Sequence, residues 1–198
     1  MPSSFFTLLN RSLFIAALFA TSLAAKAEPQ KSLLPAFGPE GTEVTVKAKG
    51  GHVVHGWLPK DWDDNTEWAP VTATYSKLDE SPGKTGVALR IKLEKMDDGV
   101  LQLTSYAGTQ TYQPGRIYRI SGWVRSADHA EISVGARQIE DPYEMYHQQD
   151  LAADSTWKQF EFEFTPKKSV KAIIMFTLKN VSTVDLAGIV LTDEGSAK

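Results

Sequence analysis

The fold is decided by the stretch Gln113-Pro114-Gly115-Arg116-Ile117-Tyr118-Arg119-Ile120-Ser121-Gly122-Trp123-Val124-Arg125. The Pro-Gly pair is a turn signal. After it, apolar and polar residues alternate with a period of two, which is typical of a β-strand with one buried face. Tyr118, Ile120 and Val124 share one face, so we expect them in the core. Trp123 and Arg125 then lie on the opposite, outward face.

The same alternation recurs over most of the chain, at Thr42–Lys47, Val71–Ser76, Val87–Glu94, Phe160–Phe164 and Lys171–Leu178. Turn signals such as Asp97-Asp98-Gly99 separate these runs. We find no stretch of ten or more residues with a helical stripe. About ten strands around one core predict an all-β fold, an antiparallel β-sandwich of the jelly-roll type.

The first residues differ in kind from the rest and predict a cleavable signal peptide over residues 1–27. Leu13–Ala25 is almost wholly apolar or small. The alternative, a membrane anchor, is disfavoured because this run is shorter than the roughly 20 residues that cross a bilayer. Ala25 and Ala27 place small residues at −3 and −1, so we expect cleavage after Ala27 and a secreted or periplasmic protein without a membrane span.

The remaining chain predicts one domain. Residues 28–41, which contain three Pro and two Gly, are expected to form a flexible, exposed lead-in. One sandwich domain follows over residues 42–194, and residues 195–198 form a tail.

Composition excludes several classes of function. The 198 residues include 24 acidic and 21 basic side chains, a formal charge of −3, and no Cys. Without Cys there are no disulfides, thiolate zinc sites, iron–sulfur ligands or cysteine nucleophiles. A nucleic-acid partner, which normally requires a basic surface, is disfavoured by the acidic balance.

Five stretches, in this order, resemble the carbohydrate-binding modules of families 4 and 9: Gly56–Trp62, Gly86–Ile91, Gln113–Arg125, Thr156–Thr165 and Val184–Leu191. This resemblance implies a galactose-binding-domain-like jelly roll with glycan bound on the concave face of one sheet. The implied partners are a polysaccharide or oligosaccharide and, because such modules accompany them, glycan-degrading enzymes.

The resemblance also raises the question of a structural calcium ion, which the family often holds with an acidic pair on its last strand. Here Ala187 and Gly188 occupy the matching positions, and Asp185 could serve only after a shift of two residues. Calcium takes six to eight oxygen ligands, so we expect no cofactor and no tight calcium site.

A sugar site needs flat aromatic rings and polar groups that orient the ring. Trp123 and Arg125 are the first candidates. Arg137, in the next run after Val134 and Ala136, is expected on the same outward side. The alternatives are that a loop covers Trp123 and that the two Arg are ordinary solvated charges.

Residues 138–150 are expected to form a loop rich in Tyr and Gln, the residue types that suit hydroxyl recognition. Gln138, Tyr143 and Tyr146 are the binding candidates within it. The alternative is that the two tyrosines pack the loop onto the sheet.

Further aromatic candidates are Tyr106 and Tyr112, which flank Gly108 on another loop. Trp62 either lines the cleft or, together with Trp68, clamps a long loop to the edge of the sandwich. Trp57 and Trp157 are assigned to packing.

An enzymatic function is disfavoured because the sequence shows no catalytic carboxylate pair, no nucleophile triad and no metal motif. Glu161 and Glu163 lie on one strand face, where a solvated role is expected. The leading hypothesis is therefore a secreted, non-catalytic glycan-binding protein. The alternatives are an envelope interaction protein that has lost sugar binding and an accessory module of a glycoside hydrolase.

Overall fold

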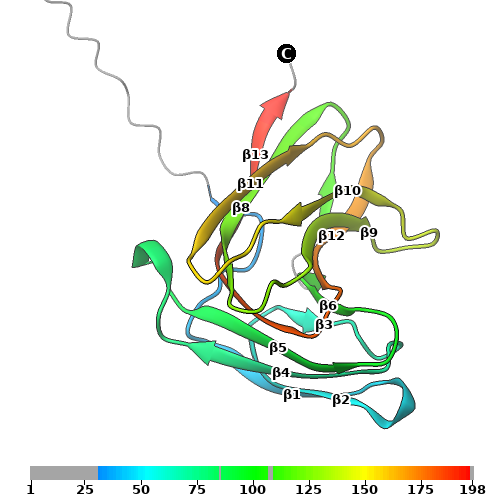
Figure 1. The fold of residues 1–198 in the computed structure, drawn as a ribbon. Coiled ribbons are helices and arrows are strands. Elements are labelled where there is room, and N and C mark those ends of the chain that lie inside the picture. The colour runs from blue at the N-terminus through cyan, green and yellow to red at the C-terminus, as the bar shows by residue number, and fades with distance from the viewer. Residues whose placement is uncertain (1–30, 85, 107–108, 197–198) are drawn as a thin grey trace, which may run out of the picture.

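A computed structural model describes residues 31–84, 86–106 and 109–196, and shows the predicted all-β sandwich of the jelly-roll type (Figure 1). Thirteen strands within these residues form two sheets. The predicted signal peptide, residues 1–27, lies outside the described residues. No helix in the described ranges has the length and hydrophobicity required to cross a membrane.

The first sheet has seven strands in the order β1-β2-β4-β5-β13-β8-β11. Their bounds are β1 Gly41–Lys47, β2 Val53–Pro59, β4 Val71–Leu78, β5 Ala88–Met96, β13 Ser182–Ser196, β8 Arg116–Ser126 and β11 Lys158–Phe164. All neighbours are antiparallel except β2 and β4, which pair in parallel. Short 3-10 helices lie at Lys49–Gly51 and Pro82–Lys84.

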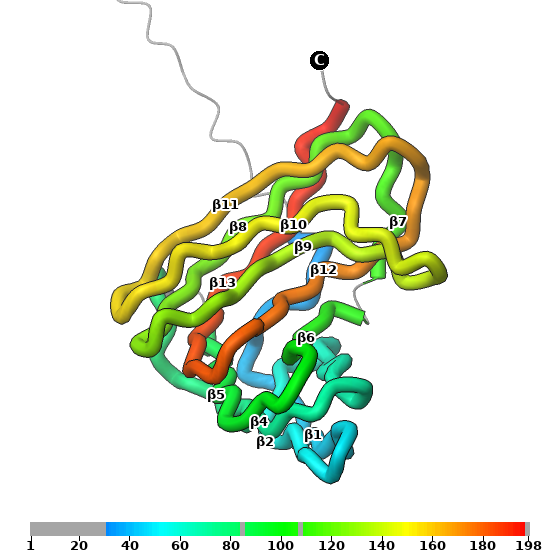
Figure 2. Tube along the Cα trace, turned by 45° about the vertical axis from the view of Figure 1, so that its right-hand side comes forward, coloured from blue at the N-terminus to red at the C-terminus, as the bar shows by residue number. Residues whose placement is uncertain are grey.

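The second sheet has six strands, and five of them follow the order β10-β9-β12-β6-β3 while β7 pairs with β12. Their bounds are β10 Met145–Leu151, β9 Ile132–Gln138, β12 Val170–Leu178, β6 Leu101–Thr104, β3 Asp63–Asp64 and β7 Gln110–Tyr112. Figure 2 shows β9, β10 and β12 running alongside one another across β8, β11 and β13.

The core lies between the sheets because alternate residues of each strand point inward. In β8, Ile120 and Val124 are fully buried, as predicted, whereas Trp123 and Arg125, which flank Val124, are only partly buried. In β9, Val134 and Ala136 point into the same core. This alternation places Trp123 and Arg137 on outward faces of their sheets.

The lead-in differs from the prediction, because its described part, residues 31–40, is packed against the sandwich. Leu34 and Phe37 are 5% and 3% exposed and belong to the core. The Leu33 amide donates to the carbonyl of Leu191 at 2.8 Å. The Pro and Gly content indicated an irregular backbone correctly, but it did not reveal that apolar side chains anchor it.

Candidate functional site

The candidate site lies on the outer face of the six-stranded sheet, where β9 presents Arg137. Its neighbours across the sheet are Met145 on β10 and Ile173 on β12. Because the adjacent Ala136 is fully buried in the core, the Arg137 side chain projects to the outside of the sheet. The guanidinium therefore stands between two apolar side chains on a sheet face.

The Arg137 guanidinium lacks a partner among the described residues apart from one aromatic ring. Its Nε is buried and makes no hydrogen bond. Its Cζ lies 5.6 Å from the centre of the Tyr143 ring, within the range of a cation–π contact. Buried polar groups are normally hydrogen-bonded, so an unsatisfied guanidinium nitrogen marks this position as unusual.

Tyr143 is presented by the turn between β9 and β10, and 54% of it is exposed. Its backbone adopts a φ of 56°, in the left-handed region that a bulky residue seldom adopts. Its amide donates to the carbonyl of Glu140 at 2.7 Å, which closes the turn. An exposed aromatic ring held in a costly backbone conformation is a feature of functional positions rather than of packing.

Gln138 and Tyr146 support this turn. The Tyr146 hydroxyl donates to Gln138 Oε1 at 2.8 Å, and Gln138 Nε2 donates to the carbonyl of Asp141 at 3.5 Å. Tyr146 is half-buried, and burial is the main cause of its raised pKa. The alternative considered for these tyrosines, packing of the loop onto the sheet, thus describes Tyr146, whereas Tyr143 stays exposed.

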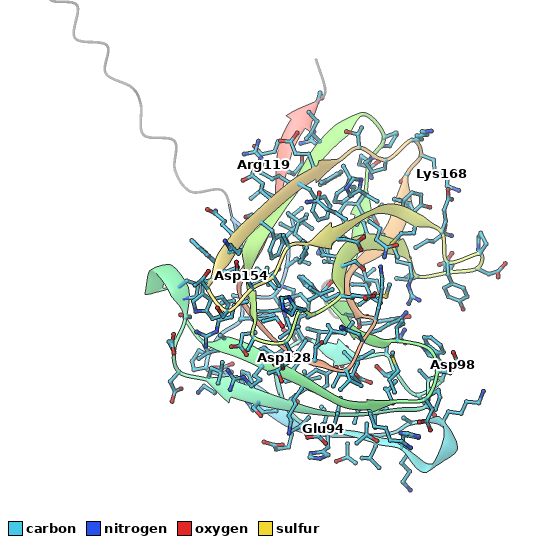
Figure 3. The ribbon with its side chains drawn as sticks, in the orientation of Figure 1. Glu94, Asp98, Arg119, Asp128, Asp154 and Lys168 are labelled. Atoms are coloured by element: carbon cyan, nitrogen blue, oxygen red, sulfur yellow. The ribbon has the colours of Figure 1, made fainter. Side chains whose placement is uncertain are left out.

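A pocket of about 420 Å³ lies beside the turn. It is lined by Thr111, Gln138, Glu140, Lys168, Ser169, Val170 and Lys171. Figure 3 places Lys168 at the end of the sandwich where the β9–β10 hairpin turns, and Asp154 at the opposite end. The Lys168 ammonium is 3.4 Å from Glu144, so this cation is already paired.

The expected loop over residues 138–150 is only partly correct, because Met145–Leu151 form strand β10. Gln148, Gln149 and Asp150 are exposed, so this edge strand lacks the apolar alternation that would have revealed it. A glycine is required at position 135 of β9, opposite β10, because a Cβ there would lie 2.8 Å from Met145 Sδ and would clash with the carbonyl oxygen of His147. Met145 therefore covers the sheet face beside Arg137.

Other polar residues of this face were not singled out from the sequence. Ser133 shares the outward register of β9 with Arg137, and its hydroxyl accepts a hydrogen bond from Gln148 Nε2 at 2.8 Å. Gln102 on β6 lies opposite Thr177 of β12 and accepts a hydrogen bond from Asn65. The alternation of Ile132–Gln138 could have identified Ser133, but no sequence signal places Gln102 beside β12.

Trp123 and Arg125 share an outward face, as predicted, but it belongs to the seven-stranded sheet. They do not meet Arg137, so the expectation of one Trp with two Arg is wrong. The physical reason is that the chain crosses from one sheet to the other between β8 and β9. Arg125 Nε donates to Asp185 at 2.7 Å, and its Cζ lies 4.5 Å from the Trp157 ring centre.

Trp62 and Tyr112 are core residues, which corrects the expectation that Tyr112 binds a ligand and excludes the possibility that Trp62 lines a cleft. They are 2% and 1% exposed. Trp62 Nε1 donates to the carbonyl of Pro35 at 3.1 Å, so this side chain clamps the lead-in. Tyr112 packs edge-on against Tyr118 with the ring centres 4.8 Å apart. Tyr106, at the end of β6, is 45% exposed and remains accessible.

Asp185, the nearest acid to the positions considered for calcium, lies between two guanidiniums. It is 3% exposed and accepts bonds from Arg90 Nε at 2.8 Å and Arg125 Nε at 2.7 Å. Throughout the part of the chain that the structure describes, no group of three or more His, Cys, Asp or Glu side chains is arranged to hold a metal ion. Glu161 and Glu163 both pair with Arg119.

Comparisons with known proteins agree with this architecture. The family model CBM_4_9, carbohydrate binding domain, matches residues 77–183. A solved CBM4 structure superposes with a TM-score of 0.59 at 16% identity, and the match covers 82% of this chain and 100% of the solved chain. The CBM22-1 xylan-binding domain from Paenibacillus barcinonensis Xyn10C gives 0.54 at 10% identity, covering 86% of this chain and 99% of that domain. No curated protein matches the chain.

Proposed function

The chain belongs to the CBM_4_9 family of carbohydrate-binding domains, and from this membership we propose that it is a non-catalytic protein that binds glycan chains on the outer face of its six-stranded sheet. Arg137 and Tyr143 are the anchor residues. The observation that carries the proposal is the pairing of an unsatisfied guanidinium with an exposed ring 5.6 Å away.

The chemistry of these two groups suits a sugar. An exposed tyrosine ring offers a flat surface for the C–H groups of a pyranose, and the guanidinium N–H groups donate to ring hydroxyls. The turn that carries Tyr143 is held by the Tyr146–Gln138 bond. This support reduces the ordering that binding requires, because the ring is already fixed near Arg137.

The proposal is tested by affinity electrophoresis against β-glucan, xylan, mannan and galactan, with wild type and Tyr143→Ala. We expect retention on at least one polymer, weakened about 2- to 12-fold by Tyr143→Ala, which corresponds to one aromatic contact. Melting temperatures should be nearly equal because Tyr143 is exposed. Absence of retention on every polymer at millimolar sensitivity contradicts the proposal.

Trp123→Ala distinguishes the two outward faces. Trp123 lies on the seven-stranded sheet, which faces away from Arg137. Glycan retention by Trp123→Ala close to that of the wild type supports the proposed face. Loss of retention in a variant that still folds would move the site to the opposite sheet.

We further propose that the protein is exported after cleavage behind Ala27. The support is the apolar run Leu13–Ala25 followed by small residues at −3 and −1. Amino-terminal sequencing of the mature protein should begin at Glu28. Retention of Met1 on the functional protein would overturn this part of the proposal.

A further inference from the structure

Arg137 differs from the other arginines that the structure describes. Arg90, Arg116, Arg119 and Arg125 each form an ion pair with an Asp or Glu at 2.6–2.8 Å. Over residues 31–84, 86–106 and 109–196, Arg137 is the arginine without such a pair. Its positive charge is therefore not neutralised by the described part of the chain.

The surroundings of Arg137 make this missing partner costly. In the sheet it stands between Met145, which is half-buried, and Ile173, which is fully buried. Its Nε is shielded from water and has no acceptor. A partly desolvated cation is stabilised by a nearby negative charge, and leaving it unpaired is unfavourable.

Acids on the neighbouring turn do not supply that charge. Glu144 pairs with Lys168 at 3.4 Å. Glu140 lines the adjacent pocket together with Lys168 and Lys171. Neither carboxylate forms an ion pair with Arg137, and Lys171 adds a further exposed positive charge at this end of the sheet. The position is thus suited to a ligand that brings its own negative group.

Resting on the proposed glycan binding, we propose that the preferred ligand is an acidic polysaccharide and that a uronic acid carboxylate binds the Arg137 guanidinium while the sugar ring contacts Tyr143. A carboxylate is planar and matches the N–H groups of a guanidinium in geometry and charge. The ring of the same sugar unit can reach Tyr143 because the two side chains are already in contact.

The test uses paired polymers that differ only at the carboxyl carbon, which is a carboxylate in one and a neutral hydroxymethyl group in the other. Isothermal calorimetry and affinity electrophoresis compare glucuronoxylan, polygalacturonate and alginate with the same polymers after chemical reduction of their carboxyl groups. We expect at least one acidic polymer to bind about tenfold or more tightly than its reduced form, as for a hydrogen bond to a charged group. Added salt should weaken this preference by screening the charges.

Two variants assign the preference to Arg137. Arg137→Gln should reduce binding of the acidic polymer to the level of its reduced form. Arg137→Lys keeps the positive charge but not the planar pair of N–H donors that matches a carboxylate, and should retain only part of the preference. Arg119→Gln is the matched control, because it removes an arginine from the outer face of the other sheet. It should leave binding unchanged.

The outcomes separate this inference from the proposed function. Equal binding of the acidic and reduced polymers, or a preference that survives in Arg137→Gln, overturns the inference while glycan binding stands. If no acidic, reduced or neutral polymer binds, the proposed function fails and the inference fails with it. An Arg137→Gln variant that melts at the wild-type temperature shows that lost binding is not lost folding.

Discussion

Asp185 shows how one residue joins three strands. Its carboxylate on β13 accepts hydrogen bonds from Arg90 on β5 and Arg125 on β8. The carboxylate is 4% exposed, whereas the guanidiniums are 40% and 21% exposed. Two positive charges therefore depend on one nearly buried acid, and breaking such an arrangement from one side is more costly than breaking a surface pair.

We therefore expect Asp185→Asn to lower the free energy of unfolding by about 2–4 kcal/mol. This loss is somewhat smaller than that for a fully buried ion pair, because the two guanidiniums are partly exposed. Urea denaturation measures the change. Asp193→Asn is the matched control, because Asp193 pairs with Arg116 at 2.7 Å but its side chain is 28% exposed. The control should lose about 1 kcal/mol or less, and equal losses in both variants would contradict the account.

The stability of the protein should also depend on pH through the carboxyl group of Asp64. Burial raises the pKa of this carboxyl, although hydrogen bonds from Tyr75 and Thr66 oppose the shift. The folded protein therefore binds this proton more tightly than the unfolded chain does. The resulting stabilisation is present below the usual pKa of 3.8 and is lost as the pH rises through the folded-state pKa.

Asp64→Asn removes that loss, so the variant should gain stability relative to wild type as the pH rises from about 4 to 7. Unfolding free energies over this range, measured in urea, give the difference between the two proteins. Hydrogen bonds from Thr156 lower the pKa of Asp154 to about 2, so the stabilisation from Asp154 is lost in acid. Both proteins carry Asp154, so its contribution cancels when the two unfolding free energies are subtracted. Asp63→Asn removes an exposed neighbouring carboxylate as a control. A wild-type minus Asp64→Asn difference that is flat with pH would show that burial does not govern Asp64.

At the scale of elements, the sequence predicted strands well and their partners poorly. The alternation at Tyr118–Arg125 and at Phe160–Phe164 correctly identified β8 and β11 and their inward faces. Period two assigns faces within a strand, but it carries no information about which sheet the strand joins. That is why Arg137 was expected beside Trp123, although the chain changes sheet between them.

The sequence predicted only part of the candidate site, because local patterns identify residue types but not tertiary contacts. Tyr143 and Gln138 were identified because their residue types cluster beside a Pro-containing turn. The sequence did not predict that Trp62 and Tyr112 are buried, because their partners Pro35 and Tyr118 are brought to them by tertiary contacts. The unsatisfied nitrogen of Arg137 depends on the absence of an acid across two other strands, which no local pattern encodes.

The packed lead-in is expected to contribute to the stability of the sandwich. A chain beginning at Glu40 lacks Leu34 and Phe37, which are both buried. It also exposes the side of Trp62 that Phe37 contacts edge-on. We expect it to be about 3–6 kcal/mol less stable than a chain beginning at Lys31, from the burial of two large apolar side chains. Urea denaturation compares the two. A difference below about 1 kcal/mol would mean that the lead-in contacts are not maintained in solution.

For the whole molecule, we expect stability to be independent of calcium. The acid nearest the positions considered for the ion is engaged by two arginines, and calcium needs several oxygen ligands. Calorimetric melting in millimolar calcium and in excess chelator should give the same temperature. A rise above about 4 °C, equivalent to more than about 1 kcal/mol of linked stabilisation, would reveal a calcium site.

Glycan binding where Arg137 and Tyr143 meet can be followed residue by residue with two-dimensional NMR of the isotope-labelled protein, titrated with an oligosaccharide of the tightest-binding polymer. We expect the amide shifts to concentrate in β9, in residues 139–144 and in β12, and the amides of β8 and β11 to remain unchanged. Shifts concentrated around Trp123 on the opposite sheet, or no shifts at millimolar sugar, would contradict binding at this site.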